Sequence, residues 1–290
     1  MSAQTIPVTF SDIGKSANDL LSKDFPVGLK LEAKTNTNTG VTFTVNGHRD
    51  AKTGNIHGDL KTKYTYPKNG VTFTGSWTTS NHLNGQLELE NNVAKGLKLD
   101  IVTQLQPAIG QRNAKAGVIF KQPGFHSKFY IDLFKGPIFY GDAVIGHEGF
   151  VLGGEGSYDV LDGKLTRFGV AAGYNAPEYS IALRTSNSLN SYTAAAYHRV
   201  QPDIEVGAKI HWDAATNNNS NNNVTLETGV KYSLDRDTFI KSRIDNFGRL
   251  GLSYTQNLRP GVKISMGGIV ETSRLNENVH RFGISLNLES

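Results

Sequence analysis

The feature that most constrains this chain is a two-residue alternation of apolar and polar side chains, which recurs from about Val27 almost to the C-terminus. In residues 41–45 and again in residues 204–212, every second residue is apolar and most of those between are polar or charged. A period of two places the apolar side chains of a strand on one face. The pattern therefore predicts one large β-sheet whose apolar face has to be covered, either by a second sheet or by lipid.

Turn-forming residues separate the alternating stretches, for example Pro67 to Gly70 and Arg259 to Gly261. No linker or change of composition divides the chain, so it is interpreted as a single sheet. Nineteen strands are predicted in this way, at residues 27–35, 40–48, 55–65, 70–79, 82–91, 95–104, 111–121, 124–133, 137–147, 149–159, 164–174, 177–186, 189–199, 202–212, 224–233, 238–246, 249–257, 262–272 and 279–288.

Composition restricts the class of protein but does not decide whether a second sheet or lipid covers the apolar face. Hydrophobic residues make up 38% of the 290 residues, and no apolar run approaches the roughly 18–20 residues that a membrane-spanning helix needs. A membrane barrel remains possible, because only alternate residues of its strands face lipid. Cysteine is absent, which excludes a disulfide framework. The net charge of +4 includes no Lys/Arg-rich run, so no nucleic-acid partner is expected.

The polar faces favour lipid on the opposite side. They bear charges of both signs on nearly every strand, so they must stay in water, and a closed barrel of this size encloses a water-filled lumen. Closure also removes the unpaired strand edges that lipid does not tolerate. The basic side chains outnumber the acidic ones, so the lumen is expected to favour anions. The lumen charges singled out are Lys61, Lys63, Lys98, Lys115, Lys209, Lys241 and Arg243.

A large soluble β-sandwich with solvated outer faces explains the alternation equally well strand by strand. It explains the uniform pattern over the whole chain less well, and the spacing of the strands is longer than the roughly 8–12 residues typical of sandwiches. If the sheet closes with an odd number of strands, the first and last must pair in parallel. Residues 27–35 should then lie beside residues 279–288.

Residues 10–25, FSDIGKSANDLLSKDF, predict the one good helix. Apolar residues such as Phe10, Ile13 and Leu20 recur at a spacing of three to four and fall near one face. Pro26 is expected to end the helix, because a proline cannot continue it. We therefore expect an N-terminal segment of residues 1–26 followed by a barrel of residues 27–290.

Several segments in order resemble the mitochondrial porins, the voltage-dependent anion channels of the outer mitochondrial membrane, and most of all the fungal members. These segments are the helix at residues 10–25, KGLK at 95–98, GHEGF at 146–150, YSLDRDTFIKSR at 232–243 and GLSYTQNLRPGVK at 251–263. The resemblance implies a 19-stranded transmembrane barrel, the number of strands known for this family, with the N-terminal helix inside the pore.

The function that the resemblance implies is a voltage-gated, weakly anion-selective pore that passes ATP, ADP, phosphate and small ions. The helix would contribute to gating, with Lys15, Asp19 and Lys23 facing the lumen and Ile13 anchoring it to the wall. Nucleotide contacts are implied, weakly, at Lys15, Lys23, Lys95, Lys98, Arg249, Leu250, Gly251, Gly267, Gly268, Ile269, Val270 and Glu271. The last strand resembles the sorting signal of mitochondrial barrels, with Arg281, Gly283, Leu286 and Leu288 in its places.

The expected location is the mitochondrial outer membrane, with membrane lipid and metabolite anions as partners and with homo-oligomers or other outer-membrane proteins as possible ones. No enzyme activity, cofactor or metal is expected. The glycine-rich stretch at residues 153–156 lies in a predicted strand rather than in a strand-to-helix turn, so it does not match a dinucleotide fingerprint. The import pore of the outer-membrane translocase, which shares the barrel, is the alternative within the resemblance.

Overall fold

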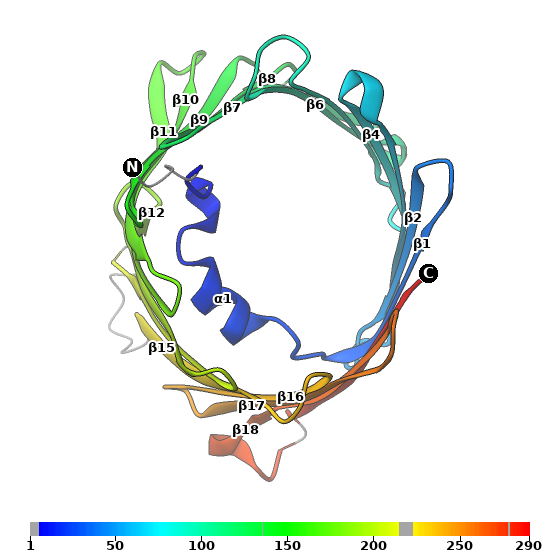
Figure 1. Ribbon diagram of the computed structural model, residues 1–290, viewed down its shortest axis with the longest axis vertical. Helices are drawn as coiled ribbons and strands as arrows, with labels where there is room; N and C mark the ends of the chain where they lie inside the picture. The colour runs from blue at the N-terminus through cyan, green and yellow to red at the C-terminus, as the bar shows by residue number, and fades with distance from the viewer. Residues whose placement is uncertain (1–5, 135, 215–222, 278) are drawn as a thin grey trace.

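The computed structural model describes residues 6–134, 136–214, 223–277 and 279–290. Over this described part of the chain, nineteen strands form one closed sheet that surrounds a central opening (Figure 1). The all-β barrel that the alternation predicts is therefore confirmed. The strands are β1 Gly28–Asn36, β2 Val41–Arg49, β3 Ile56–Tyr66, β4 Val71–Thr78, β5 Leu83–Glu90, β6 Leu97–Gln106, β7 Gln111–Gln122, β8 Phe125–Asp132, β9 Ile138–His147, β10 Phe150–Asp159, β11 Lys164–Asn175, β12 Tyr179–Ser186, β13 Ser191–Gln201, β14 Ile204–Asp213, β15 Val224–Ser233, β16 Thr238–Asp245, β17 Arg249–Arg259, β18 Val262–Glu271 and β19 Arg281–Glu289.

Successive strands pair antiparallel, and the ring is closed by one parallel pair, β1 with β19. Gly28 lies opposite Gly283 and Lys34 opposite Glu289 in this seam. The C-terminal residue extends it, because the Ser290 amide donates to the Lys34 carbonyl over 2.9 Å. The parallel closure that an odd strand number requires is therefore confirmed, and each of the nineteen described strands has a neighbour on both sides, as lipid requires.

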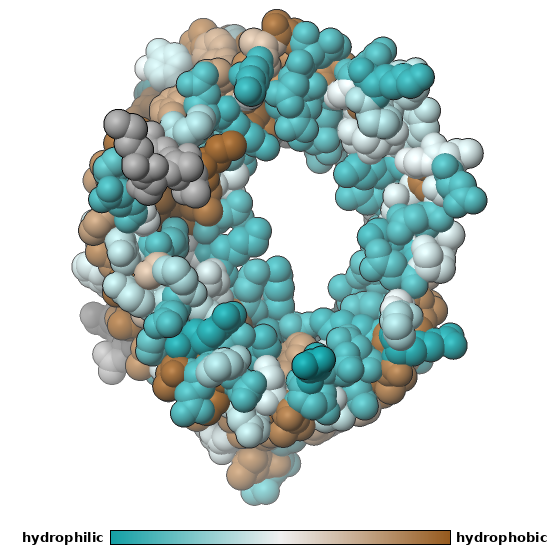
Figure 2. Space-filling model, viewed as in Figure 1, coloured by the Kyte–Doolittle hydropathy of each residue, from teal (hydrophilic) through white to brown (hydrophobic). Residues whose placement is uncertain are grey.

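The two faces of the sheet differ sharply in polarity. Figure 2 shows hydrophilic residues around the central opening and hydrophobic residues along the outer edge of the ring. Large apolar side chains project outward into open space, among them Trp77 at 58% exposure and Phe282 at 66%. An apolar surface of this extent needs a cover, and in a closed single-layer barrel that cover is lipid. The soluble β-sandwich is therefore wrong.

The N-terminal segment departs from the prediction of one helix over residues 10–25. It forms a 3₁₀ turn, η1 (Phe10–Asp12), and a shorter α-helix, α1 (Lys15–Ser22). Gly14 separates them because it adopts the left-handed conformation, φ +82°, which ends a helical run. The helix stops well before Pro26, because Lys23 is already extended and Asp24 is left-handed at φ +65°. Three further 3₁₀ turns connect strands: η2 (Pro67–Asn69), η3 (Pro107–Ile109) and η4 (Thr272–Arg274).

Within the described ranges, no helix is both long and apolar enough to cross a membrane. Instead, α1 lies inside the ring, along the wall formed by β13 to β15 (Figure 1). Its buried side chains are Ala17, Leu20 and Leu21. The preceding η1 and the residue after it pack on the wall as well, and the buried apolar cluster there consists of Phe10, Ile13, Val144, Val151, Ala171 and Ala182. The lumen is therefore narrowed on one side by a segment that is not part of the wall.

Candidate functional site

The apolar face of the N-terminal segment fits into gaps left by glycines of the wall. A Cβ atom at Gly173 would lie 3.3 Å from Ile13 Cγ2, and one at Gly207 would lie 3.3 Å from Leu20 Cδ2. A Cβ at Gly229 would lie only 2.8 Å from Leu21 Cδ2. These glycines let the helix approach the wall closely enough to bury its apolar side chains. Ile13, expected to anchor the helix, is buried in a cluster with wall residues such as Val151 and Ala171.

The polar face of the helix is turned to the lumen, as expected for Lys15, Asp19 and Lys23. Lys15 pairs with Asp12 over 3.0 Å and Lys23 with Asp19 over 2.7 Å. Both lysine side chains are more than half exposed. A hydrogen bond from the Thr9 hydroxyl lowers the pKa of Asp12, burial opposes this, and Lys15 lowers the pKa further. Both lysines are therefore accessible to an anion in the pore.

The predicted lumen charges fall into three groups. Lys61 and Lys63 on β3 are exposed and make no ion pair among the described residues. Lys98 pairs with Glu88, and Lys209 pairs with Glu227 over 3.3 Å. Lys115 belongs with these two in a second group held by other wall side chains, because its Nζ lies 4.6 Å from the Tyr140 ring centroid.

Lys241 and Arg243 form the third group, and they serve the helix rather than the open lumen. Lys241 Nζ donates to the carbonyls of Asp19 and Lys23 over 3.3 and 3.2 Å. Arg243 donates to the Leu21 carbonyl over 2.8 Å. Both residues, predicted as lumen charges, are therefore engaged by the end of α1.

Two wall residues that the sequence does not single out also hold the N-terminal segment. The guanidinium of Arg184 lies 4.6 Å from the Phe10 ring centroid and 3.3 Å from Glu155. The Nδ1 atom of His126 lies 3.3 Å from the Pro7 carbonyl oxygen. Alternation places both on the polar faces of their strands. Nothing local in the sequence indicates contact with a segment more than a hundred residues away.

The residues implied in nucleotide contact do not form one cluster. Arg249 faces Glu271 and Gly251 faces Ile269 across β17 and β18, so the two C-terminal stretches are brought together. Leu250, Gly268 and Val270 alternate with them and belong to the outward face of the same pair. Lys98 is on β6 and Lys95 just precedes that strand, which lies across the ring from β17 and β18 (Figure 1). Lys15 and Lys23 are on the helix.

A small lumen cavity of about 240 Å³ borders the β17 and β18 stretch. Arg243, Arg249 and Arg281 line it together with Glu227 and Asp245. Asp245 accepts from Arg249 Nε over 2.6 Å. Arg281 is thus a lumen residue at the start of β19, as is Gly283. Leu286 and Leu288, the apolar places of the expected sorting signal, belong to the outward face of that strand.

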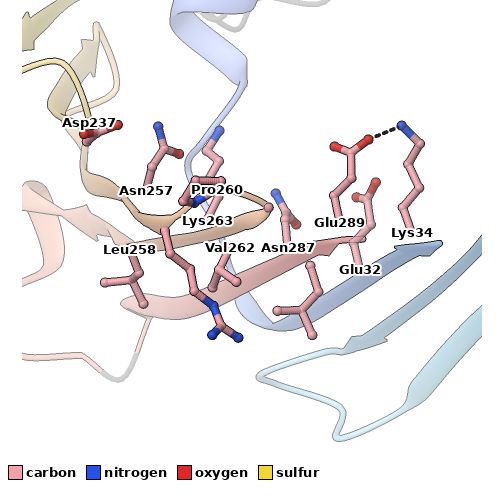
Figure 3. A pocket seen from close by; sticks show the side chains of 13 residues that line it. Glu32, Lys34, Asp237, Asn257, Leu258, Pro260, Val262, Lys263, Asn287 and Glu289 are labelled. Carbon is pink, nitrogen blue, oxygen red and sulfur yellow. Dashed lines mark hydrogen bonds and ion pairs between the residues drawn. The ribbon is translucent and has the colours of Figure 1, made fainter. Parts of the chain in front are cut away.

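A larger cavity of about 670 Å³ lies at the rim where the turn between β17 and β18 meets the seam (Figure 3). Lys34 and Glu289 form an ion pair across the parallel strands here. Glu32, Asp237 and Lys263 add further charges of both signs. The mixture of charges favours no one sign of ligand, so we assign this cavity to the architecture of the seam.

Known proteins agree with this architecture. The sequence model of the family described as "Eukaryotic porin" matches residues 6–283. The mitochondrial outer membrane protein porin of Neurospora crassa is 39% identical over 97% of this chain and 98% of its own length. The non-selective voltage-gated ion channel VDAC2 of Xenopus laevis is 33% identical over 98% of this chain and all of its own. Among solved structures, a mutant of the Rh. blastica porin superposes with a TM-score of 0.51 at 13% identity, covering 83% of this chain and 98% of that one, which supports the fold alone. By the family match and by these relatives, the chain belongs to the eukaryotic porin family.

Proposed function

We propose that this protein is a voltage-gated pore of the mitochondrial outer membrane through which metabolites and small ions diffuse. The observation that most strongly supports this is the closed barrel, polar toward its open lumen and apolar toward its surroundings. Its relatives are named as a mitochondrial outer membrane porin and as a voltage-gated ion channel. They are not named as import pores, so the alternative of a polypeptide-conducting pore is not favoured.

Weak anion selectivity is part of the proposal. Basic side chains outnumber acidic ones on the lumen face, and Lys61 and Lys63 are exposed there. Several other lysines are offset by carboxylates, so the net field is modest. It is also screened, since the Debye length at physiological salt is about 8 Å. Metabolite anions such as ATP, ADP and phosphate are the proposed cargo, and small cations should pass as well.

We further propose a division of work between the N-terminal segment, residues 1–26, and the barrel, residues 27–290. The barrel supplies the lipid contact and the conducting path. The segment supplies charges that can respond to a transmembrane voltage, since each elementary charge moved across the field is worth about 2.3 kcal/mol per 100 mV. Nucleotides passing through the pore would meet Lys15 and Lys23 on its exposed face. Association with further copies or with other outer-membrane proteins is compatible with the apolar exterior.

Reconstitution into planar lipid bilayers tests the proposal. We expect stepwise conductance increases on insertion, partial closure at high voltage of either sign, and a reversal potential in a salt gradient that has the sign of anion preference. A preparation that is refolded, binds liposomes and yet gives no conductance would contradict the pore function.

A further inference from the structure

In the linker between α1 and the first strand, residues 23–27, one carboxylate pairs with two lysines of the wall. Asp24 Oδ2 lies 3.0 Å from Lys241 Nζ on β16, and its Oδ1 lies 2.9 Å from Lys263 Nζ on β18. Figure 3 shows Lys263 beside the ribbon of the N-terminal segment. One side chain of the linker thus bridges two strands that are not neighbours in the sheet.

The same lysine also contacts the end of the helix. Besides Asp24, Lys241 donates to the carbonyls of Asp19 and Lys23, and Arg243 donates to that of Leu21. The last carbonyls of a helix lack partners within it and form the negative end of its dipole, so cations are favoured there. Within the segment, the Lys23 amide donates to the Asp19 carbonyl, and the wall supplies further donors to the end of the helix.

The rest of the linker is fitted to the wall beside this carboxylate. The Arg243 guanidinium lies 4.8 Å from the Phe25 ring centroid. A Cβ at Gly251 would be 3.3 Å from Phe25 Cδ1, and one at Gly267 would be 3.1 Å from Pro26 Cδ. Two glycines of the stretches that resemblance implies in nucleotide contact therefore make room for the linker.

Burial and backbone geometry make Asp24 the specific residue for this place. The Lys241 side chain is only 6% exposed, and a cation at that depth requires a counter-charge. Asp24 is left-handed at φ +65°, a conformation that Asp and Asn tolerate better than most residues. Burial acts to raise its pKa, but Lys263 and Lys241 outweigh this and hold the pKa below its ordinary value. Asp19, by contrast, pairs with Lys23 of its own N-terminal segment and not with the wall through its carboxylate.

We infer that Asp24 is a positioning residue, whose carboxylate clasps β16 and β18 and so fixes α1 against the wall while neutralising two lysines of the lumen. This deepens the proposed pore function, but the positioning itself can be tested without any current. Three side chains make up the clasp: Asp24, Lys241 and Lys263.

The absence of cysteine allows a clean thiol reporter of helix position. Ala17 is buried between α1 and the wall at 1% exposure, so an Ala17→Cys protein should react slowly with a water-soluble maleimide. Adding Asp24→Asn keeps the backbone preference and removes the charge. We expect labelling to accelerate by roughly tenfold or more, since hydrogen bonds between charged groups are the strong ones. Asp19→Asn, the same change on the same segment, is the matched control and should leave the rate unchanged.

A second variant keeps the test independent of how well Asp24→Asn folds. Lys263 is 34% exposed and lies on the lumen face, so Lys263→Gln should refold. It should accelerate labelling less than Asp24→Asn does. Combined with Asp24→Asn, it should add nothing further, because both remove the same interaction. Equal labelling rates with and without Asp24→Asn, or fully additive effects of the two changes, would overturn the clasp.

A disulfide lock separates position from charge in the bilayer. A Cβ at Gly207 would lie 3.8 Å from Leu20 Cβ, the typical separation in a disulfide. Asp24→Asn should shift the closing voltage when the helix is not locked. In Leu20→Cys/Gly207→Cys protein carrying Asp24→Asn, we expect oxidation to return the closing voltage to that of the same double-cysteine protein with Asp24 intact. Reduction of the disulfide should bring the shift back. The anion preference should rise with Asp24→Asn in both redox states, because Lys241 and Lys263 have lost their counter-charge. A closing voltage that Asp24→Asn shifts equally in the oxidised and reduced lock would overturn the positioning role.

Failure of the pore function and failure of the clasp can be told apart. If the unaltered protein gave no current, the pore function would fail and the labelling result would still decide the clasp.

Discussion

At the scale of single residues, the sign of the pore depends on which lumen charges are free. Lys61 and Lys63 on β3 are exposed and unpaired among the described residues, whereas Lys209 already faces Glu227. Reversing both, as Lys61→Glu with Lys63→Glu, replaces two positive charges by two negative ones in a chain whose net charge is +4. We expect the anion preference to vanish or invert, measured as the reversal potential in a salt gradient.

Lys52→Glu is the matched control for this pair, because Lys52 lies in the turn between β2 and β3 rather than in the lumen wall. It should change the reversal potential much less. A reversal potential that stays at the value of the unaltered protein after both lumen lysines are reversed would show that anion preference arises elsewhere.

Acid should loosen the N-terminal segment through two carboxylates, Asp24, which holds it to the wall, and Asp12, which pairs with Lys15 inside it. The pKa values of Asp12 and Asp24 are both lowered in the folded protein. A lowered carboxyl pKa contributes stability that is present above the unfolded value, about 3.9 for Asp, and is lost as the pH falls through the folded value. Attachment of the segment should therefore be constant from neutral pH down to about pH 4 and weaken below it.

Pepsin, which is active in acid, provides the measurement. Cleavage next to the buried Leu20 and Leu21 should accelerate below about pH 4, relative to an unstructured peptide of the same sequence. Asp24→Asn protein should be cleaved faster than the unaltered protein already at the higher pH values at which pepsin is active. Equal protection of the segment across the whole range would contradict a role for these carboxylates.

At the scale of elements, the packing of α1 depends on space left by wall glycines. A Cβ at Gly207 meets Leu20 Cδ2 at 3.3 Å, so the larger Gly207→Val side chain should push the helix off β14. Overpacking of this kind typically costs about 1–3 kcal/mol. We expect amide hydrogen exchange to rise over Lys15–Ser22 while the strands remain protected. Gly47→Val, on β2 where nothing lies within 4 Å of the added Cβ, is the control.

The strands could be predicted from the sequence, and the details of the helix could not. Alternation of period two is a local signal that most of the strands repeat, and length and turn spacing predict the others, at residues 111–121, 137–147 and 189–199. The number of strands and the parallel seam then follow from counting. The break at Gly14 is a backbone choice that the 3–4 spacing of apolar residues conceals. The engagement of Lys241 by the helix depends on a contact between residues 222 apart in sequence. The sequence alone does not distinguish a lysine that contacts the N-terminal segment from one that faces the open lumen.

At the scale of the whole molecule, closure depends on one parallel pair that has no hairpin to support it. Gly283 is the tightest point of this seam, since an added Cβ would lie 2.5 Å from the Gly28 carbonyl oxygen and 2.6 Å from its amide nitrogen. These are backbone atoms and cannot turn aside as a side chain could. Gly283→Ala should therefore separate β19 from β1 while the antiparallel hairpins persist. Gly154→Ala, whose added Cβ has its nearest neighbour at an ordinary 3.8 Å, is the matched control.

Gly283 also occupies a place in the expected sorting signal, so the test has to use protein refolded in detergent, where no sorting machinery acts. We expect amide exchange to increase along Gly28–Asn36 and Arg281–Glu289, and the conductance after reconstitution to become unstable, because an open edge exposes unpaired backbone groups to lipid. Both effects belong to the ring as a whole, since each hairpin keeps its own partners. Stable conductance together with unchanged exchange in both strands would contradict this prediction. The backbone at Gly28 would then accommodate the added methyl group without loss of stability, and closure of the barrel would not depend on this contact.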